Sequence, residues 1–389
     1  MYGKAFETGV YRNFFAEIGI TEEEIDRRLK EIVDTFFYGD DDKRVYYPAE
    51  PDMGYLEDTG NHDARTEGMS YGMMMCVQLD MKEEFDRIWR WSKKYMYMNE
   101  GEDEGYFAWS CQVTGEKNAM GPAPDGEEYF AMALFFASHR WGDGEGIYNY
   151  SEQAREILRA ALHKGENGRP GAPMWNRDNH LILFVPGAGH TDPSYHLPHF
   201  YELFALWAYE EDREFWKEAA NASREFLSRA CHPVTGLNPD SANFDATPMS
   251  GIPWWKFTDE SFFYSDAYRT AANIGLDYEW FGVEAGHEGV PLRMMRFFRT
   301  NLEAARCAYA IDGKPLDMMT VMHPTGVLAA TAEGALTVPY KQGNPDWETA
   351  ARWVKWFWDQ PLREGGRRYY DNCLYIFAFL ALSGRYRIW

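Results

Sequence analysis

Cysteine is scarce in this sequence, and the few cysteines form no recognisable pair. Five of them are scattered over 389 residues without a C-x-x-C spacing, which favours reduced thiols inside a cell over a disulfide framework. No stretch approaches the roughly 18 consecutive apolar residues that a membrane-spanning helix needs. The first residues, Met1 to Glu7, also lack the apolar core and cleavage site of a secretory signal. We therefore expect a cytoplasmic protein.

Basic residues are outnumbered, with 39 Lys and Arg against 61 Asp and Glu and a net charge of −22. Nucleic acids and anionic membranes attract basic surfaces, so neither is an expected partner. The glycines of 142–146 follow a predicted helix and not a strand, which excludes a dinucleotide-binding loop. His196 and His199 have a metal-like spacing, but Pro198 lies between them and they need not share a helix face. We expect a monomer without metal or cofactor.

Aromatic residues, by contrast, are abundant. The sequence has 15 Trp, 25 Tyr and 25 Phe, which make up 17% of the chain. Some of these rings must fill a core, for which the hydrophobic content of 45% is ample. Flat rings also suit the apolar faces of sugars, so the composition leaves both uses open.

The apolar residues recur mostly at helical spacing. They predict about twelve helices, few strands and no linker, so we expect one catalytic domain over 1–389. Six antiparallel helical hairpins closed into a ring, an (α/α)6 barrel with its long loops over the active-site end, would accommodate such a chain. A helical solenoid is the rival, but no repeat of fixed period is present. The predicted helices are 21–37, 67–79, 83–98, 129–141, 151–163, 198–209, 212–230, 259–276, 291–309, 324–336, 346–359 and 369–382.

Glu67 lies in a Gly- and hydroxyl-rich turn that leads directly into an apolar helix. A helix start attracts anions and would keep this carboxyl ionised. Burial beside the apolar run would favour the protonated form instead, as a proton donor near neutral pH requires. The alternative is a glutamate that merely caps a core helix.

Asp125 and Asp266 also lie where a loop meets an apolar helix. Asp125 follows Pro124 and could simply be the N-cap of the next helix. Asp266 is expected inside the helix 259–276 among aromatic residues, where a charge needs a partner. Arg269, three residues later, would lie on the same face and could keep it ionised. This pair could be a base with its partner or a buried structural ion pair.

One carboxyl kept protonated and another kept ionised is the pattern required for glycosidic bond cleavage. This hypothesis competes with a helical-barrel sugar isomerase that acts on single sugars through His or Tyr, and with a sugar-binding protein that has no activity.

Several segments together carry a resemblance to a known family, and it extends over nearly the whole chain. They are Thr66–Gly72, Tyr106–Trp109, Gly121–Phe130, Asp192–His196, Ser265–Arg269 with Ala271–Asn273, and Tyr369–Asn372. With these segments the sequence resembles glycoside hydrolase family 8, in particular its exo-acting branch. The resemblance implies an (α/α)6 barrel and an inverting hydrolase that releases xylose from the reducing end of short β-1,4-xylo-oligosaccharides.

The resemblance also implies roles for individual residues. Glu67 would be the general acid, and Asp266 the general base held by Arg269. Asp125 would bind and help to distort the sugar at the cleavage point. For inversion, roughly 6.5–9.5 Å should separate the two catalytic carboxyl groups, to leave room for water.

Four further residues are expected to bind the substrate. Tyr195 would lie near the catalytic water and Trp109 would stack on a sugar ring. Tyr369 belongs to the last matching segment, and His323, just before a helix, is the candidate for contact with the anomeric hydroxyl.

One segment departs from the family's pattern. Where the family has Ala, Ser or Thr, Asp, Gly or Ala, and Asp, this chain has Ala123-Pro124-Asp125-Gly126-Glu127. This weakens the likeness to the endo-acting members and suits the exo-acting branch. An endo-acting β-1,4-glycanase (xylanase) remains the alternative within the family.

Overall fold

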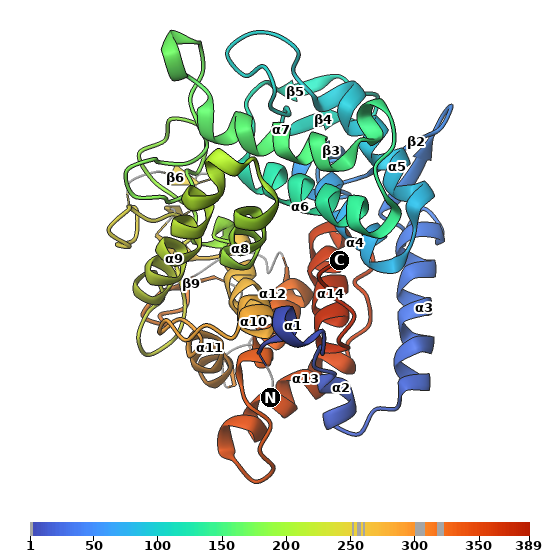
Figure 1. The fold of residues 1–389 in the computed structure, drawn as a ribbon. Helices are drawn as coiled ribbons and strands as arrows, with labels where there is room; N and C mark the ends of the chain where they lie inside the picture. Colours follow the sequence, from blue (N-terminus) through green and yellow to red (C-terminus); the bar gives the residue numbers. More distant parts are fainter. Residues whose placement is uncertain (1–2, 251–252, 255–257, 260, 300–307, 317–322) are drawn as a thin grey trace.

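Helices dominate the computed structural model of the protein (Figure 1). It describes the chain apart from residues 1–2, 251–252, 255–257, 260, 300–307 and 317–322. Four cysteines are buried free thiols, and the fifth, Cys307, lies outside the described residues. Within the described part, every helix is too short or too polar to cross a bilayer.

The described helices form two concentric rings around a common axis (Figure 1), which confirms the predicted (α/α)6 barrel. Two short helices, α1 (Ala5–Thr8) and α2 (Phe14–Glu17), precede the rings. The inner ring comprises α4 (Thr66–Leu79), α6 (Pro124–Trp141), α8 (Pro198–Trp207), α10 (Arg269–Phe281), α12 (Pro324–Glu333) and α14 (Arg368–Leu382). The outer ring comprises α3 (Glu22–Tyr38), α5 (Lys82–Trp91), α7 (Tyr150–His163), α9 (Arg213–Ala230), α11 (Val290–Phe298) and α13 (Pro345–Trp358).

The pattern of apolar residues along each helix determines whether it belongs to the inner or the outer ring. Every residue of α14 is buried, and so is α6 from Pro124 to Ala137, because beyond their polar first turns these helices are apolar on all sides. The outer helix α3 instead buries only four residues, at helical spacing, among them Ile25 and Ile32. It begins with a capping box formed by Thr21 and Glu24.

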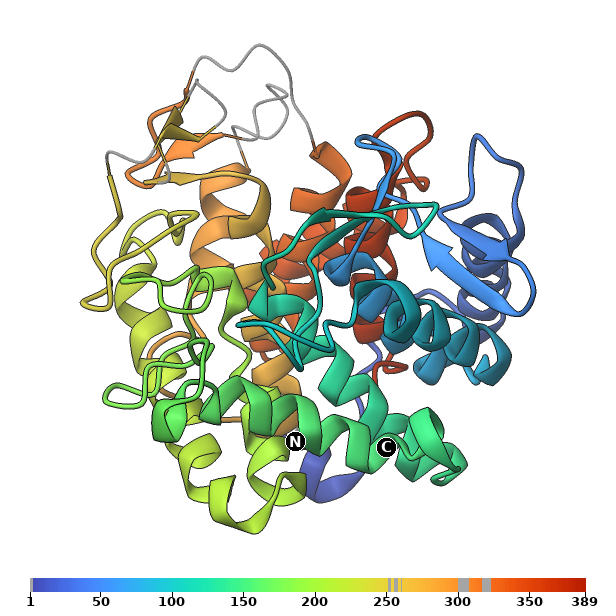
Figure 2. The same ribbon diagram turned by 90° about the horizontal axis from the view of Figure 1, so that it is seen from above.

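Short antiparallel strand pairs occupy the connecting loops. They are β1 (Tyr46–Ala49) with β2 (Met53–Leu56), β3 (Asp63–Arg65) with β4 (Ser110–Gln112) and β5 (Lys117–Ala119), β6 (Pro253–Trp254) with β7 (Thr258–Asp259), and β8 (Phe262–Phe263) with β9 (Tyr309–Ala310). In Figure 2 most strands and long loops lie toward one end of the barrel, and both chain termini lie toward the other.

The amino ends of the inner helices meet at the loop end. Glu67 and Asp125, in the first turns of α4 and α6, both contact Arg269, the first residue of α10. Tyr369 at the start of α14 reaches Glu67, and Ser194 just before α8 reaches Arg269. The positive ends of several helix dipoles are therefore directed at one cluster of carboxylates.

Two predicted helices were wrong by about ten residues at one end, and the predicted helix 129–141 begins earlier, at Pro124. The predicted helix 259–276 begins only at Arg269, because 262–263 pair as a strand and Ser265 has a φ of +39°. Asp266 therefore lies in a 3-10 turn, η6 (Ser265–Tyr268), before the helix and not inside it. The predicted helix 291–309 ends at Phe298, and Tyr309 belongs to β9.

Candidate active site

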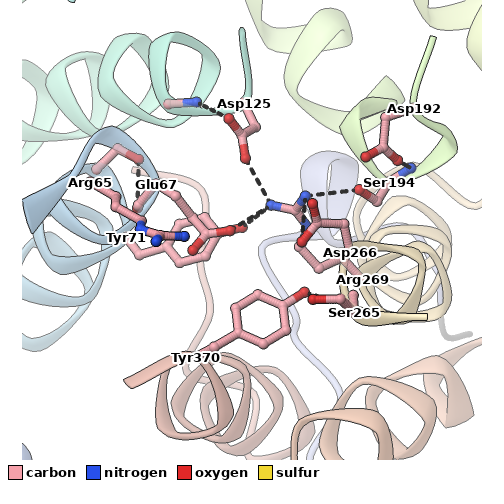
Figure 3. Close-up of polar contacts among 12 residues, drawn as sticks. Arg65, Glu67, Tyr71, Asp125, Asp192, Ser194, Ser265, Asp266, Arg269 and Tyr370 are labelled. Atoms are coloured by element: carbon pink, nitrogen blue, oxygen red, sulfur yellow. Dashed lines mark hydrogen bonds and ion pairs between the residues drawn. The ribbon is translucent and has the colours of Figure 1, made fainter. Parts of the chain in front are cut away.

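Arg269 is the centre of the site. Its side chain is only 5% exposed, and Nη1 donates to Glu67 Oε2 at 3.0 Å and to Asp125 Oδ2 at 2.9 Å. The same nitrogen lies 2.9 Å from the hydroxyl oxygen of Tyr71. Figure 3 shows these side chains converging on the guanidinium from different inner helices. One cation therefore joins two carboxyl groups that are distant in sequence. Glu67 and Asp125 are 58 residues apart, and Arg269 lies more than 100 residues after both.

The second terminal nitrogen of Arg269, Nη2, contacts a different set of residues. Nη2 donates to Ser194 Oγ at 2.9 Å, whereas Asp266 Oδ1 lies 3.6 Å away. The pairing expected between Asp266 and Arg269 is therefore real but long, and the closer carboxylates are Glu67 and Asp125. The reason is that Arg269 opens an inner helix and directs its side chain to the barrel axis.

Glu67 is the carboxyl group with the environment of a proton donor. Burial raises its pKa to about 7, with further contributions from Asp125 and Asp266, although Arg269 and the hydroxyl of Tyr369 oppose the shift. That hydroxyl donates to Oε1 at 2.7 Å. The group is thus close to half-protonated at neutral pH, where a general acid is most useful.

Gly68 permits the contact between Glu67 and Tyr369. A Cβ on Gly68 would lie 2.6 Å from the Tyr369 ring, closer than any real contact. Only glycine lets the tyrosine approach the start of α4 this closely.

Asp125 occupies the second position of α6, so the N-cap alternative is wrong. Its Oδ1 accepts from the backbone N–H of Gly126 at 2.9 Å, and Oδ2 accepts from Arg269. Burial raises the pKa of this carboxyl, and Arg269 opposes that effect.

Asp266 differs from these two carboxyl groups by its accessibility. Its side chain is 38% exposed, against 15% for Glu67 and 10% for Asp125. The turn that carries it is held by the hydroxyl of Tyr370, which donates to Ser265 O at 3.0 Å (Figure 3). Asp266 is therefore the carboxylate that water reaches most easily.

The remaining predicted residues surround this centre. The ring of Tyr195 lies 5.4 Å from the Arg269 guanidinium carbon. Trp109 is 37% exposed, and its carbonyl accepts from the N–H of Thr66 at 2.9 Å, which places it beside the Glu67 turn. His323 caps α12 and contacts Tyr370, with 4.9 Å between the ring centroids.

Sequence reasoning assigned no role to several polar residues of the site. Asn273 Nδ2 donates to Ser194 O at 2.8 Å and so supports the serine that binds Arg269. Asp192 accepts from the N–H of Ser194 at 2.7 Å, and burial together with Asp266 raises its pKa. Tyr71 and Asn273 follow Glu67 and Arg269 by four residues, one helical turn, which is a signal that could have identified them.

The chain is similar in sequence and in structure to glycoside hydrolases. Residues 52–384 match the family model of glycosyl hydrolases family 8. The chain is 55% identical over 389 residues to the reducing end xylose-releasing exo-oligoxylanase of Halalkalibacterium halodurans, covering 99% of this chain and 96% of that protein. It is 52% identical over 385 residues to the exo-oligoxylanase Rex8A of Paenibacillus barcinonensis, covering 99% and 98%. The structure of Rex8A complexed with xylose superposes with a TM-score of 0.93 at 52% identity, covering 99% of each chain.

Proposed function

This chain belongs to glycosyl hydrolases family 8, and from that premise we propose that it releases xylose from the reducing end of short β-1,4-xylo-oligosaccharides with inversion. The observation that carries the proposal is the convergence of Glu67, Asp125 and Asp266 on one buried arginine. Two relatives that are more than half identical over nearly the whole chain bear the name of this activity.

In the proposed reaction, Glu67 protonates the oxygen of the leaving sugar. Its pKa of about 7 supports this role, since the protonated form is then available at neutral pH. Asp266 takes a proton from the attacking water, as its greater exposure favours. The two groups contact different nitrogens of one guanidinium, so both lie at the same centre. An inverting enzyme needs roughly 6.5–9.5 Å between them.

The other residues bind and orient the sugar chain. Asp125 holds the ring at the cleavage point, Tyr195 lies by the catalytic water, and Trp109 offers a stacking surface. Tyr369 orients Glu67 through its 2.7 Å hydrogen bond. His323 contacts the reducing-end sugar.

We also propose that residues 1–389 form one catalytic domain and that the protein is a cytoplasmic monomer. The single core cluster, which extends from Ala5 to Tyr386, supports one domain. The buried free thiols among the described residues support a reducing compartment.

Xylotriose with ¹³C at C1 of its reducing-end residue tests the proposal. The label should appear in xylose, and the unlabelled xylobiose should form first as its α-anomer, both followed by NMR during turnover. Label in xylobiose would overturn reducing-end release, and an initial β-anomer would overturn inversion. Conversion of xylose alone would instead support the isomerase, and internal products from xylohexaose would support an endo-acting enzyme.

A further inference from the structure

We propose that Asp371 is a positioning residue that fixes the tautomer of His323, so that Nε2 of this ring presents a hydrogen-bond acceptor to the reducing-end sugar. The inference deepens the proposed function and rests on it for the identity of the sugar. The ring orientation and the tautomer can be tested without any activity.

The contacts of Asp371 determine where the histidine proton lies. Its side chain is fully buried, and Oδ2 is 3.1 Å from His323 Nδ1. Arg363 Nη1 donates to the same oxygen, while Oδ1 accepts from the N–H of Gly326 at 2.6 Å. A carboxylate can only accept, so His323 Nδ1 must carry the hydrogen.

Nε2 of His323 is then left as the acceptor of the neutral ring. Among the described residues no hydrogen-bond partner of this nitrogen is present. The ring packs edge-on against Tyr370, whose hydroxyl binds the carbonyl of Ser265, the residue before Asp266. Contacts through Tyr370 therefore link His323 to the turn that carries the proposed base.

This acceptor would distinguish a free reducing end from every other position in the sugar chain. Only the reducing-end residue has an anomeric hydroxyl, which can donate a hydrogen bond to Nε2. An internal residue or a methyl glycoside has no hydrogen there and would leave the nitrogen unpaired, which costs affinity.

Four consecutive residues at the start of α14 each bind a different partner. Tyr369 binds Glu67, Tyr370 binds the turn of Asp266, and Asp371 binds His323. Asn372 exchanges two hydrogen bonds with the backbone of Arg363, at 2.8 and 3.0 Å. Because successive helix residues point about 100° apart, one helix start reaches all of these groups.

The first test is the ¹⁵N spectrum of the wild-type protein with labelled histidine. Among its ten histidines, His323 is assigned by difference from His323→Phe. We expect Nδ1 to be protonated and Nε2 to be unprotonated. A proton on Nε2 in the neutral ring would overturn the proposal, whether or not the enzyme cleaves xylotriose.

The second test is Asp371→Asn. The amide of asparagine replaces one accepting oxygen with an N–H group, which can donate to His323 Nδ1 only if that nitrogen has lost its hydrogen. The histidine proton should therefore move to Nε2. We expect the preference for xylotriose over its methyl β-glycoside to fall by about tenfold, through KM, with kcat within about threefold of wild type. A moved proton with an unchanged preference would refute the proposal. If this variant does not fold, His323→Phe should show the same lost preference, because it retains only the ring contact with Tyr370.

Asp277→Asn is the matched control. Asp277 is also buried and bonded to a histidine and an arginine, His287 and Arg224, but its contacts lie outside the site. Its substitution should leave the preference for free xylotriose unchanged. An equal loss in this control would mean that the effect of Asp371→Asn is not specific to His323, and would overturn the proposal.

Discussion

Two buried clusters of charge in this molecule use the same residue types and behave in opposite ways. In the first, Arg269 meets Glu67 and Asp125 at hydrogen-bond distance and Asp266 at longer range. In the second, Arg224 binds both oxygens of Asp277, at 2.9 and 2.7 Å. His287 Nε2 adds a hydrogen bond to Asp277 at 2.9 Å.

The acidities of the two clusters differ in direction. Burial alone would raise the pKa of both Glu67 and Asp277. Around Asp277, Arg224 and His287 outweigh burial and hold the pKa well below its usual range. Around Glu67, a single guanidinium is shared with other carboxylates, which repel a further negative charge, and the pKa rises to about 7.

The number of buried carboxylates that share one cation therefore separates a proton-donating site from a structural ion pair. A surplus of carboxylates around one arginine leaves one of them protonated near neutral pH. In the second cluster Asp277 is the fully buried carboxylate and contacts both Arg224 and His287, whereas Glu202 contacts Arg224 from a partly exposed position. Asp277 therefore stays ionised and joins helices. Four predictions test this comparison.

Glu67→Gln should have the largest effect on activity. It keeps the shape of the side chain and removes the proton, so turnover of xylotriose should fall by about 10²–10⁴-fold. Below the unfolded pKa of the glutamate, thermal unfolding should change little, since the folded site already holds a neutral group there. Product release measured by chromatography tests this, and unchanged turnover would exclude Glu67 as the acid.

Asp277→Asn should show the reverse pattern. It leaves Arg224 and His287 buried without their charged partner, so the free energy of unfolding should fall by about 3–5 kcal/mol. Activity per folded molecule should remain that of the wild type. Urea unfolding and active-site titration check the two parts, and a stable but inactive variant would break the comparison.

The pH dependence of the two clusters should also be opposite. The pKa of Glu67 is raised to about 7, so kcat/KM should fall as pH rises through that value.

The contribution of Glu67 to stability is present below the unfolded pKa and is lost as pH rises to about 7. Glu67→Gln should therefore gain in stability relative to wild type over this range. The pKa of Asp277 is lowered, so its contribution is present above about pH 4 and is lost in stronger acid. Unfolding curves for wild type and both variants measure these trends, and parallel curves would contradict them.

Glu202→Gln should have the smallest effect. Glu202 accepts from Arg224 Nη1 at 2.6 Å, but its side chain is 28% exposed and water can replace the contact. We expect a change of about 1 kcal/mol or less in the free energy of unfolding. A loss as large as that of Asp277→Asn would show that solvent does not compensate at this end of the cluster.

Local sequence signals predicted much of the fold. Thr21 and Glu24 form the capping box that their spacing indicates, and uniformly apolar segments became inner helices. The same signals failed for the helix start at 259, because Phe262 and Phe263 pair with residues 48 and 46 positions later, Ala310 and Tyr309, and this pairing is not visible locally.

By itself the sequence predicted the ring of helices and identified the three acidic residues Glu67, Asp125 and Asp266, because helical spacing and the residues around each acid can be read along the chain. It also carried the likeness to the family. Only the tertiary structure decided that Arg269 binds Glu67 and Asp125 more closely than Asp266, and that Asp371 faces His323. Arg269 is 202 and 144 residues from Glu67 and Asp125, and Asp371 is 48 residues from His323. These contacts exist only once the inner helices bring their amino ends together.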